Sequence, residues 1–420
     1  MKLAYKFYYR KKFPELDTLC IVSNDLYNQA NYIVKEEFKK SGKWLRYNDL
    51  DKVLKTTENL NHEINYRKLK AQVAQQVLRI LDKNWTSFFN SLKAYKKNPK
   101  DFKGLPKSPG FRKTKDRNLL VYTNQSCQIK DNNRITLEEN IELSIPKTDI
   151  DFSKFQQIRV LPRKRRYEIE IVYNKDCVNF ELDQENYLTT DLGVDNFAAC
   201  VSKEGSFLLD GKSIKSVNQY FNKMKAKNQA YRDKKGKNVC HKKSYELSNY
   251  RGMFTRDQFH KMTRFLINYC ILKNIGTIVC GYNKQWKDSI DIGKINNQKF
   301  VCMPHKLFLK ILKYKCELVG IVLICKEESY TSKCDSLALE PVKKQKKYLG
   351  KRVKRGLFQS SMGKLINADV NGALNTLRKV IGDCLFIKGI IDSVVLFNPV
   401  KIRFADLSCE QTLSNFLVRC

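Results

Sequence analysis

Long apolar runs and histidine are both scarce in this sequence. No segment approaches the apolar length of a membrane span, and the N-terminal stretch MKLAYKFYYRKK lacks the apolar core of a signal peptide. We therefore expect a cytoplasmic protein without membrane contact, nucleoid-associated if the source is a prokaryote. The chain has only 4 His in 420 residues, which gives histidine-based catalysis little support.

The sequence has no closely spaced cysteine pairs. The 14 Cys are scattered as single residues, and Cys316 and Cys334 have no close partner in the sequence. This pattern is typical of reduced thiols in the cytosol, most of them small core residues, rather than of a disulfide-stapled secreted domain.

Negative charge is also scarce. The chain has 79 Lys and Arg against 43 Asp and Glu, a net charge of +36. Nucleic acid is the leading partner for so basic a chain, because each contact with a phosphate releases counterions. Aromatic residues mixed into basic stretches such as YKFYYRKKF suit base stacking as well. A merely solvated basic surface is the alternative.

The length of the chain predicts two or three domains, and the N-terminal half changes in character along its course. Residues 3–9 fit a strand, residues 16–40 have helical periodicity, and residues 67–94 carry an apolar helical stripe. Residues 96–117 form a basic loop rich in Pro and Gly. Short alternating runs over residues 119–172 predict an all-β module.

The C-terminal half predicts a mixed α/β sheet. Strands are expected around Asp191, at 197–201, 205–209 and 275–283, and from 320 into a polar turn at 332. Helices are expected at 213–244, 254–273, 304–318 and 365–380.

Carboxylates stand at the ends of these strands. Asp191 ends the first strand, Glu327 and Glu328 end the last one, and Asp369 lies in the first turn of the helix at 365–380. Acids brought together in this way repel unless cations lie among them, and oxygen ligands select Mg²⁺ or Mn²⁺. Two such ions about 4 Å apart cleave phosphodiesters.

Each acid also fits an ordinary structural role. An Asp after a strand is commonly a turn or cap residue, Asp369 suits the positive end of a helix dipole, and Asn367 suits the helix cap. Each structural reading alone is favoured over the catalytic one. The ordered combination of the acids on a strongly basic chain nevertheless favours a metal site.

Four stretches over residues 188–379 resemble the transposon-encoded TnpB proteins, relatives of type V CRISPR effectors and Fanzor proteins. They are TTDLGVDNFAA, DQFHKMTRFLINYCILKNIGTIVCGYNKQWK, EESYTSKCD and GLFQSSMGKLINADVNGALNTL. The resemblance implies a multidomain α/β plus β-barrel protein. Its parts would be a RuvC-type, RNase H-like nuclease domain and an N-terminal wedge or OB-like barrel with a helical recognition insertion.

The implied domain boundaries follow the family plan. The wedge or barrel would comprise residues 1–14 and 108–184, with the recognition insertion at 15–107. The nuclease domain would be split into 185–332 and 364–383, with a zinc-ribbon-like insertion at 333–363 and a C-terminal tail at 384–420.

By the same resemblance, Asp191 matches the first RuvC acid and Asp369 the third. The usual second acid stands at the end of the central strand, where this chain has Gly281. Some relatives carry a glutamate just before the YTS element instead, so Glu328 is assigned as the second acid and metal ligand, with Glu327 as the fallback. Since neighbouring strand residues face opposite ways, we expect only one of the two to point at the metals.

The family's zinc ribbon is degenerate in this chain. Relatives hold zinc there with two CxxC pairs, but only Cys334 lies near a ligand position, and Gln359 and Met362 stand where the second pair is expected. One thiol cannot hold a structural Zn²⁺, so we expect no zinc and an insertion held without metal.

Basic residues outside the acids are expected to contact nucleic acid. The candidates lie in the basic loop, on the helix before TIVCG and in the degenerate ribbon: Lys103, Arg112, Lys113, His260, Lys261, Arg264, Lys351 and Arg352. For the helix residues, a solvated face is an equally good interpretation.

These features together predict an Mg²⁺-dependent, RNA-guided DNA endonuclease. Its partners would be a guide RNA and a double-stranded DNA target with a short adjacent motif, while the oligomeric state stays open. The missing usual glutamate supports an alternative, an RNA-guided DNA-binding regulator that no longer cleaves. A DNA-strand transferase is a third, weaker hypothesis, because RNase H-like folds support both chemistries.

Overall fold

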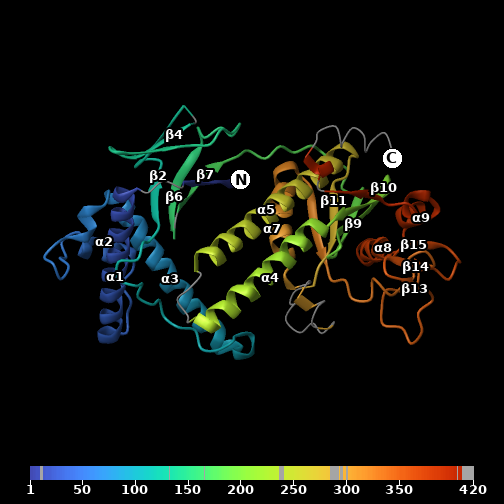
Figure 1. Ribbon diagram of the computed structural model, residues 1–420, viewed down its shortest axis with the longest axis horizontal. Helices are drawn as coiled ribbons and strands as arrows, with labels where there is room; N and C mark the ends of the chain where they lie inside the picture. Colours follow the sequence, from blue (N-terminus) through green and yellow to red (C-terminus); the bar gives the residue numbers. More distant parts are fainter. Residues whose placement is uncertain are drawn as a thin grey trace. The chain divides into compact units, whose positions relative to one another are not determined.

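The computed structural model describes residues 1–9, 13–131, 133–164, 166–235, 241–283, 293, 297–298, 301–403 and 405–408. The chain divides into two compact units, Met1–Asp176 and Cys177–Cys420. Figure 1 shows their helices and strands. Among the described residues, no helix combines the length and the apolar character needed to cross a membrane.

Helices and two antiparallel sheets build the first unit. The helices are α1 (Pro14–Ser41), α2 (Tyr47–Leu54) and α3 (Ala71–Lys97), with 3₁₀ turns η1 (Asn65–Lys68) and η2 (Pro99–Asp101). One sheet has the order β1 (Lys2–Tyr9), β7 (Arg166–Asn174), β6 (Phe155–Arg163) and β2 (Leu120–Thr123). The other comprises β3 (Gln128–Lys130), β4 (Arg134–Glu138) and β5 (Ile141–Ser144). Side chains from the helices and both sheets share one hydrophobic core.

The elements expected in this half are largely confirmed. The N-terminal strand is present and pairs along its whole length with β7, so the two ends of the unit lie side by side. The predicted helix at 67–94 is α3, whose buried stripe includes Val73, Val77, Leu81 and Trp85. Its first residues instead form η1, which ends before the helix begins. Closure of the sheets into a barrel stays a prediction.

The basic loop is fixed to α1 by a row of asparagines. Asn24, Asn28 and Asn31 follow one face of the helix at steps of four and three residues. Asn24 Nδ2 donates to the carbonyl of Lys113 (3.0 Å), and Asn28 Nδ2 donates to that of Arg112 (3.0 Å). Asn28 Oδ1 in turn accepts the amide N–H of Arg112 at 2.8 Å. The loop backbone is therefore held extended along the helix rather than left free.

Asn31 is a fully buried member of this row, as is Asn24. Its Nδ2 reaches the carbonyls of Pro109 (3.1 Å) and Gly110 (3.3 Å), and its Oδ1 accepts Trp85 Nε1–H at 3.0 Å. One amide thus connects the loop, α1 and α3.

A six-stranded mixed sheet forms the centre of the second unit. Its order is β12 (Val322–Lys326), β11 (Thr277–Gly281), β8 (Tyr187–Leu192), β9 (Asn196–Ser202), β10 (Gly205–Asp210) and β16 (Val400–Ile402). The neighbours β12, β11 and β8 run parallel, and β9 is antiparallel to β8 and β10. Three strands β13 (Lys351–Lys354), β14 (Leu357–Gln359) and β15 (Leu365–Asn367) form a separate small sheet.

Helices cover both faces of the large sheet (Figure 1). On one face, side chains of α5 (His241–Leu272) and α7 (His305–Val319) share a core with Ala198 and Cys200 of β9. On the other, α8 (Ala368–Ile381) and α9 (Leu385–Asp392) pack with Ala199 and Val201 of the same strand. The alternation along β9 explains why the strand is apolar throughout.

Three features of this half differ from the sequence-based expectation. The helix expected at 213–244 ends earlier, because α4 is Lys212–Lys235 and α5 already begins at His241. The helix expected at 254–273 is therefore only the second half of a longer one. Residues 384–420, expected as a tail, contain α9, the 3₁₀ turns η3 (Val394–Leu396) and η4 (Ala405–Ser408), and β16, which pairs in parallel with β10.

Asn31→Ala should loosen the basic loop. The change leaves the Trp85 indole N–H buried without an acceptor and the carbonyls at 109 and 110 without their donor. We expect a loss of about 2–3 kcal/mol of local stability. Hydrogen exchange of the peptides covering 80–90 and 105–115 measures it. Tyr32→Ala, at the next and 58% exposed position, is the control. Equal exchange in both variants would contradict the role given to Asn31.

Candidate active site

Three parallel strands end at the same edge of the large sheet, and their ends carry the acids. Asp191 is the next-to-last residue of β8, Gly281 is the last of β11, and Glu328 follows two residues after β12. β11 lies between the other two. Because adjacent strands are about 4.8 Å apart, a side chain from beyond β12 must pass over the end of β11 to reach β8.

Asp191 and Glu328 meet across that gap. Their carboxylates lie within hydrogen-bonding distance of each other, and both residues are half-buried. Burial raises the pKa of Asp191, and the charge of Asp369 adds to it. Burial likewise raises the pKa of Glu328, and the facing Asp191 raises it further. Two carboxylates in this position must share a proton or a cation.

Gly281 leaves the space that the Glu328 carboxylate fills. A Cβ at position 281 would lie 2.5 Å from Glu328 Oε2. Asp191 is accommodated in the same way by α8, because a Cβ on Gly372 would lie 2.7 Å from Asp191 Oδ2. Two glycines on different elements therefore shape one cavity around the two carboxylates. Glu328 is further fixed by Asn283, whose Oδ1 accepts the Glu328 backbone N–H at 3.0 Å.

Glu327 faces away from this pair. Its Oε2 lies 2.9 Å from Lys379 Nζ, and its Oε1 accepts the backbone N–H of Ser329 at 2.8 Å. The chain thus turns only one of the two consecutive glutamates toward Asp191.

Asp369 lies beside the pair but is bonded to other groups. Asn367 caps α8 as expected, with its Oδ1 accepting the N–H groups of Asp369 (2.9 Å) and Val370 (3.3 Å). Asp369 Oδ2 accepts Asn196 Nδ2–H at 2.8 Å, and Arg352 Nη2 lies 3.6 Å from Asp369 Oδ1. Asn196 was not predicted as a site residue. Its only signal in the sequence is its place five residues after Asp191 in the same motif.

A divalent cation fits the donor set at Asp191 and Glu328. Glu328 Oε2 is buried, and none of the described residues donates a hydrogen bond to it. Hard carboxylate oxygens without donors are the ligands that Mg²⁺ and Mn²⁺ prefer. Asp369 does not complete a three-acid group in this arrangement. Across residues 1–235, 241–283 and 301–408, leaving out the masked positions, no three His, Cys, Asp or Glu side chains converge on one metal position.

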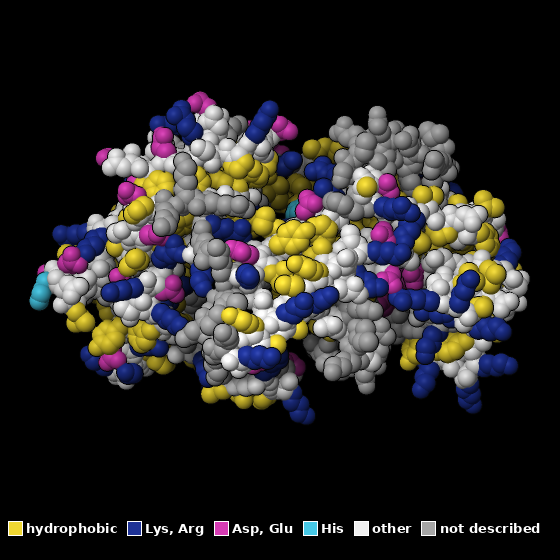
Figure 2. All heavy atoms as spheres, viewed as in Figure 1, with side chains coloured by type: hydrophobic (Ala, Val, Ile, Leu, Met, Phe, Trp, Pro, Cys, Tyr) yellow, Lys and Arg dark blue, Asp and Glu magenta, His cyan; other side chains and the backbone are white. Residues whose placement is uncertain are grey.

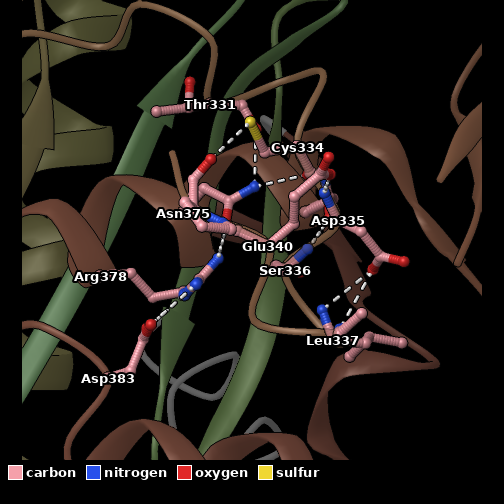
Figure 3. A network of polar contacts seen from close by, with 12 residues as sticks. Thr331, Cys334, Asp335, Ser336, Leu337, Glu340, Asn375, Arg378 and Asp383 are labelled. Carbon is pink, nitrogen blue, oxygen red and sulfur yellow. Dashed lines mark hydrogen bonds and ion pairs between the residues drawn. The ribbon is translucent and has the colours of Figure 1, made fainter. Parts of the chain in front are cut away.

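The insertion after β12 is organised by a buried aspartate (Figure 3). Asp335 Oδ2 accepts hydrogen bonds from the Ser360 hydroxyl (2.8 Å) and from the Ser361 N–H (2.8 Å) and hydroxyl (3.0 Å). Its Oδ1 accepts the backbone N–H groups of Leu337 and Ala338. One carboxylate thereby joins the start of the insertion to the segment after β14.

Neighbouring polar groups extend the network to α8. Asn375 Nδ2 donates to the carbonyls of Thr331 (2.8 Å) and Cys334 (2.7 Å). Arg378, also on α8, donates to the carbonyl of Glu340 (3.0 Å) and pairs with Asp383. Cys334 is buried, and its Sγ lies 3.5 Å from the carbonyl of Pro341. The thiol therefore contacts a backbone oxygen, and hydrogen bonds account for the shape of the insertion.

The predicted nucleic-acid contacts differ in their surroundings. Lys103, Lys113, Arg264, Lys351 and Arg352 are exposed, and basic side chains project from the part of the surface around β13 (Figure 2). Lys261 lies 3.2 Å from Asp257. Burial, together with the charge of Lys315, lowers the pKa of His260 to about 4, so His260 is neutral at pH 7 and brings no charge to a phosphate. Arg112 is half-buried over the Tyr27 ring, 4.6 Å from its centroid.

Two family models match this chain. One, described as a probable transposase, matches residues 171–287. The other, a Cas12f1-like TNB domain, matches residues 305–376. Together they span the sheet edge with its acids, the insertion and most of α8.

Similar proteins are found among curated sequences and solved structures. The TnpB-like protein ORF457 of Acidianus two-tailed virus is 24% identical over 407 residues, covering 88% of this chain and 84% of the viral protein. A chain in the cryo-EM structure of the Cas12f1–sgRNA–target DNA complex superposes with a TM-score of 0.55 at 14% identity, covering 87% of this chain and 84% of that one. The fold is therefore the RuvC-containing multidomain α/β fold of these proteins.

Gly281→Ala should disturb the carboxylate pair without unfolding the sheet. The new methyl group displaces the flexible end of Glu328 from Asp191, so we expect Mn²⁺ binding to weaken by about tenfold. Stability should change by about 1 kcal/mol or less. Calorimetric titration with Mn²⁺ measures the affinity. Gly252→Ala on α5, where a Cβ meets nothing within 4 Å, is the matched control. Unchanged Mn²⁺ affinity would show that Glu328 is not a ligand.

Asp335→Asn should destabilise the insertion strongly, whereas Cys334→Ser should destabilise it little. The amide group of Asn would face N–H and O–H donors, so we expect a loss of about 3 kcal/mol in the stability of the insertion. Serine keeps a small donor near the Pro341 carbonyl, so Cys334→Ser should be mild. Hydrogen exchange over residues 333–363 measures both, with elemental analysis for zinc. A severe Cys334→Ser variant, or about one zinc per chain, would mean that the thiol binds metal.

Proposed function

Because this chain belongs to the TnpB family, we propose that it is an RNA-guided DNA endonuclease from a mobile element or derived from one. The observation that carries the proposal is the half-buried, facing Asp191–Glu328 pair at the ends of parallel strands. Two facing carboxylates destabilise a fold unless they share a proton or a cation, so the pair is best explained by function.

In this proposal Asp191 and Glu328 hold Mg²⁺ or Mn²⁺, with Asp369 as the third acid. The bound metal would activate water and stabilise the leaving oxygen of a phosphodiester. The chain itself contributes position. Gly281 and Gly372 make room for the carboxylates, Asn283 fixes the backbone of Glu328, and Asn196 orients Asp369.

Recognition of nucleic acid would use the basic surfaces. The exposed lysines and arginines of the loop at 96–117 and of the insertion would contact the backbones of guide RNA and target DNA. Pairing with the guide would select the target, beside a short motif read as duplex. We assign residues 1–14 and 108–184 to the wedge, 15–107 to the recognition insertion, and 185–332 with 364–383 to the nuclease domain.

A cleavage-deficient regulator is the second candidate. It is favoured by the bonds that hold Asp369 to Asn196 and near Arg352, away from a three-acid group. Such a protein would bind a guide and a matched target but would not cut under any divalent cation.

Single substitutions separate the two candidates. Asp191→Ala, Glu328→Ala and Asp369→Ala should each lower cleavage of a matched DNA target in Mg²⁺ by roughly a hundredfold or more, because each removes an oxygen ligand. Target binding should stay near wild type, since the guide and target surfaces are untouched. Glu327→Ala is the matched control and should cleave nearly normally. Cleavage assays and gel-shift binding with the co-purified RNA provide the measurements.

The outcomes divide clearly. If Glu327 is essential and Glu328 is dispensable, the nuclease proposal stands with the wrong glutamate. If the wild-type complex binds its target and never cuts with Mg²⁺ or Mn²⁺, the regulator is correct.

A further inference from the structure

The first unit contains a pocket whose lining residues all precede the acids of the candidate active site in the sequence. Its volume is about 330 Å³, and it is lined by residues of α1, α3 and the basic loop: Tyr27, Asn84, Ser87, Phe88, Ser91, Pro106, Lys107 and Pro109. Volumes from about 300 Å³ upward are typical of small-molecule sites. The four residues from α3 recur at helical spacing, so one face of that helix forms a wall.

The opposite wall is fixed by the asparagine row. Asn31 and Asn28 hold the loop backbone at 109–112, and Asn31 also binds Trp85 of α3. The pocket is therefore formed before any ligand arrives. A preformed site loses less entropy on binding than one that must order its own loop.

The polar groups of the α3 wall are mainly hydrogen-bond acceptors. Asn84 Nδ2 is already used on Tyr27 Oη (3.1 Å), and none of the described residues donates to Asn84 Oδ1. The hydroxyls of Ser87 and Ser91 donate to helix carbonyls at 2.8 Å, so their lone pairs remain to accept. A fitting ligand therefore carries N–H or O–H donors. The rings of Phe88, Pro106 and Pro109 supply apolar surface for a flat group.

The charge beside the pocket is positive. Lys107 lines it, and the Arg112 guanidinium lies over the Tyr27 ring. The buried Arg112 Nε has no hydrogen-bond partner among the described residues. No acidic residue lines the pocket. The ligand is therefore expected to be anionic.

A flat group with donors on its edge and an attached anion describes a nucleotide. We propose that this pocket binds one unpaired nucleotide of a nucleic-acid strand, with the base against Phe88 and Asn84 and the phosphate at Lys107 and Arg112. A base within a duplex has its edge paired and its faces stacked, so only an unpaired or extruded base can enter. The proposal rests on the proposed function only in assuming that the chain meets single strands. RNA and DNA offer the same chemistry.

The test fills the pocket and measures binding without divalent cations, so that its result does not depend on cleavage. Ser87→Trp places a large ring in the pocket from an exposed helix position, and Asn84→Asp adds a negative charge there. Asn90→Trp, exposed on another face of α3, is the matched control. Fluorescence anisotropy with labelled single-stranded RNA, single-stranded DNA, duplex DNA and heparin gives the affinities.

We expect Ser87→Trp and Asn84→Asp to weaken single-strand binding by about tenfold, as for loss of one stacked base, and Asn90→Trp to leave it unchanged. Heparin binding should stay unchanged for Ser87→Trp. Iodouridine cross-links should map to the peptides containing Tyr27 or Phe88. If the pocket variants weaken binding of single-stranded RNA more than of single-stranded DNA, or the reverse, the more affected strand is the one that the pocket binds. Wild-type affinity in both pocket variants, or an equal loss for heparin and single strands, overturns the proposal. Either result leaves the cleavage assays on Asp191 and Glu328 unaffected.

Discussion

The repulsion between the facing carboxylates of Asp191 and Glu328 is the constraint on which the second unit depends. Glycines and polar groups of the surrounding chain hold the two acids close together despite this repulsion. Gly281 and Gly372 have no side chain that would collide with the carboxylates, and Asn283 fixes the backbone of Glu328. Arrangements that store unfavourable charge in a rigid core persist where function requires them.

The strand order explains how a glutamate beyond β12 can stand in for one on β11. β11 lies between the strands that precede Glu328 and contain Asp191. A glutamate at position 281 would reach Asp191 from the adjacent strand. With glycine there, the longer route over the strand end is open, and the Glu328 carboxylate lies where a side chain of residue 281 would begin. The glycine at 281 and the position of the Glu328 carboxylate are thus two aspects of one arrangement.

Much of this architecture could be predicted from the sequence, because strong periodicity determined the elements. The apolar stripe of α3 and the apolar runs of β9 and β11 left few alternatives. The boundaries of α4 and α5 were harder, since a polar basic stretch carries little periodicity across the break. The strand β16 was missed because three residues at a sheet edge have no pattern of their own. The positions of Glu328 and Asp369 remain the least predictable, since they depend on contacts with distant segments, with Asn283 for Glu328 and with Asn196 for Asp369.

The insertion at 333–363 also contains a carboxylate away from solvent, but there hydrogen-bond donors stabilise the charge. Asp335 is fully buried, and the hydrogen bonds to its carboxylate come from N–H or O–H donors. A carboxylate with a full set of donors holds a loop together, as a metal ion holds one through its ligands. A carboxylate that faces another one, as Glu328 faces Asp191, calls for a cation. The number of donors around each acid therefore separates the structural carboxylate of Asp335 from the pair that we propose as the metal site.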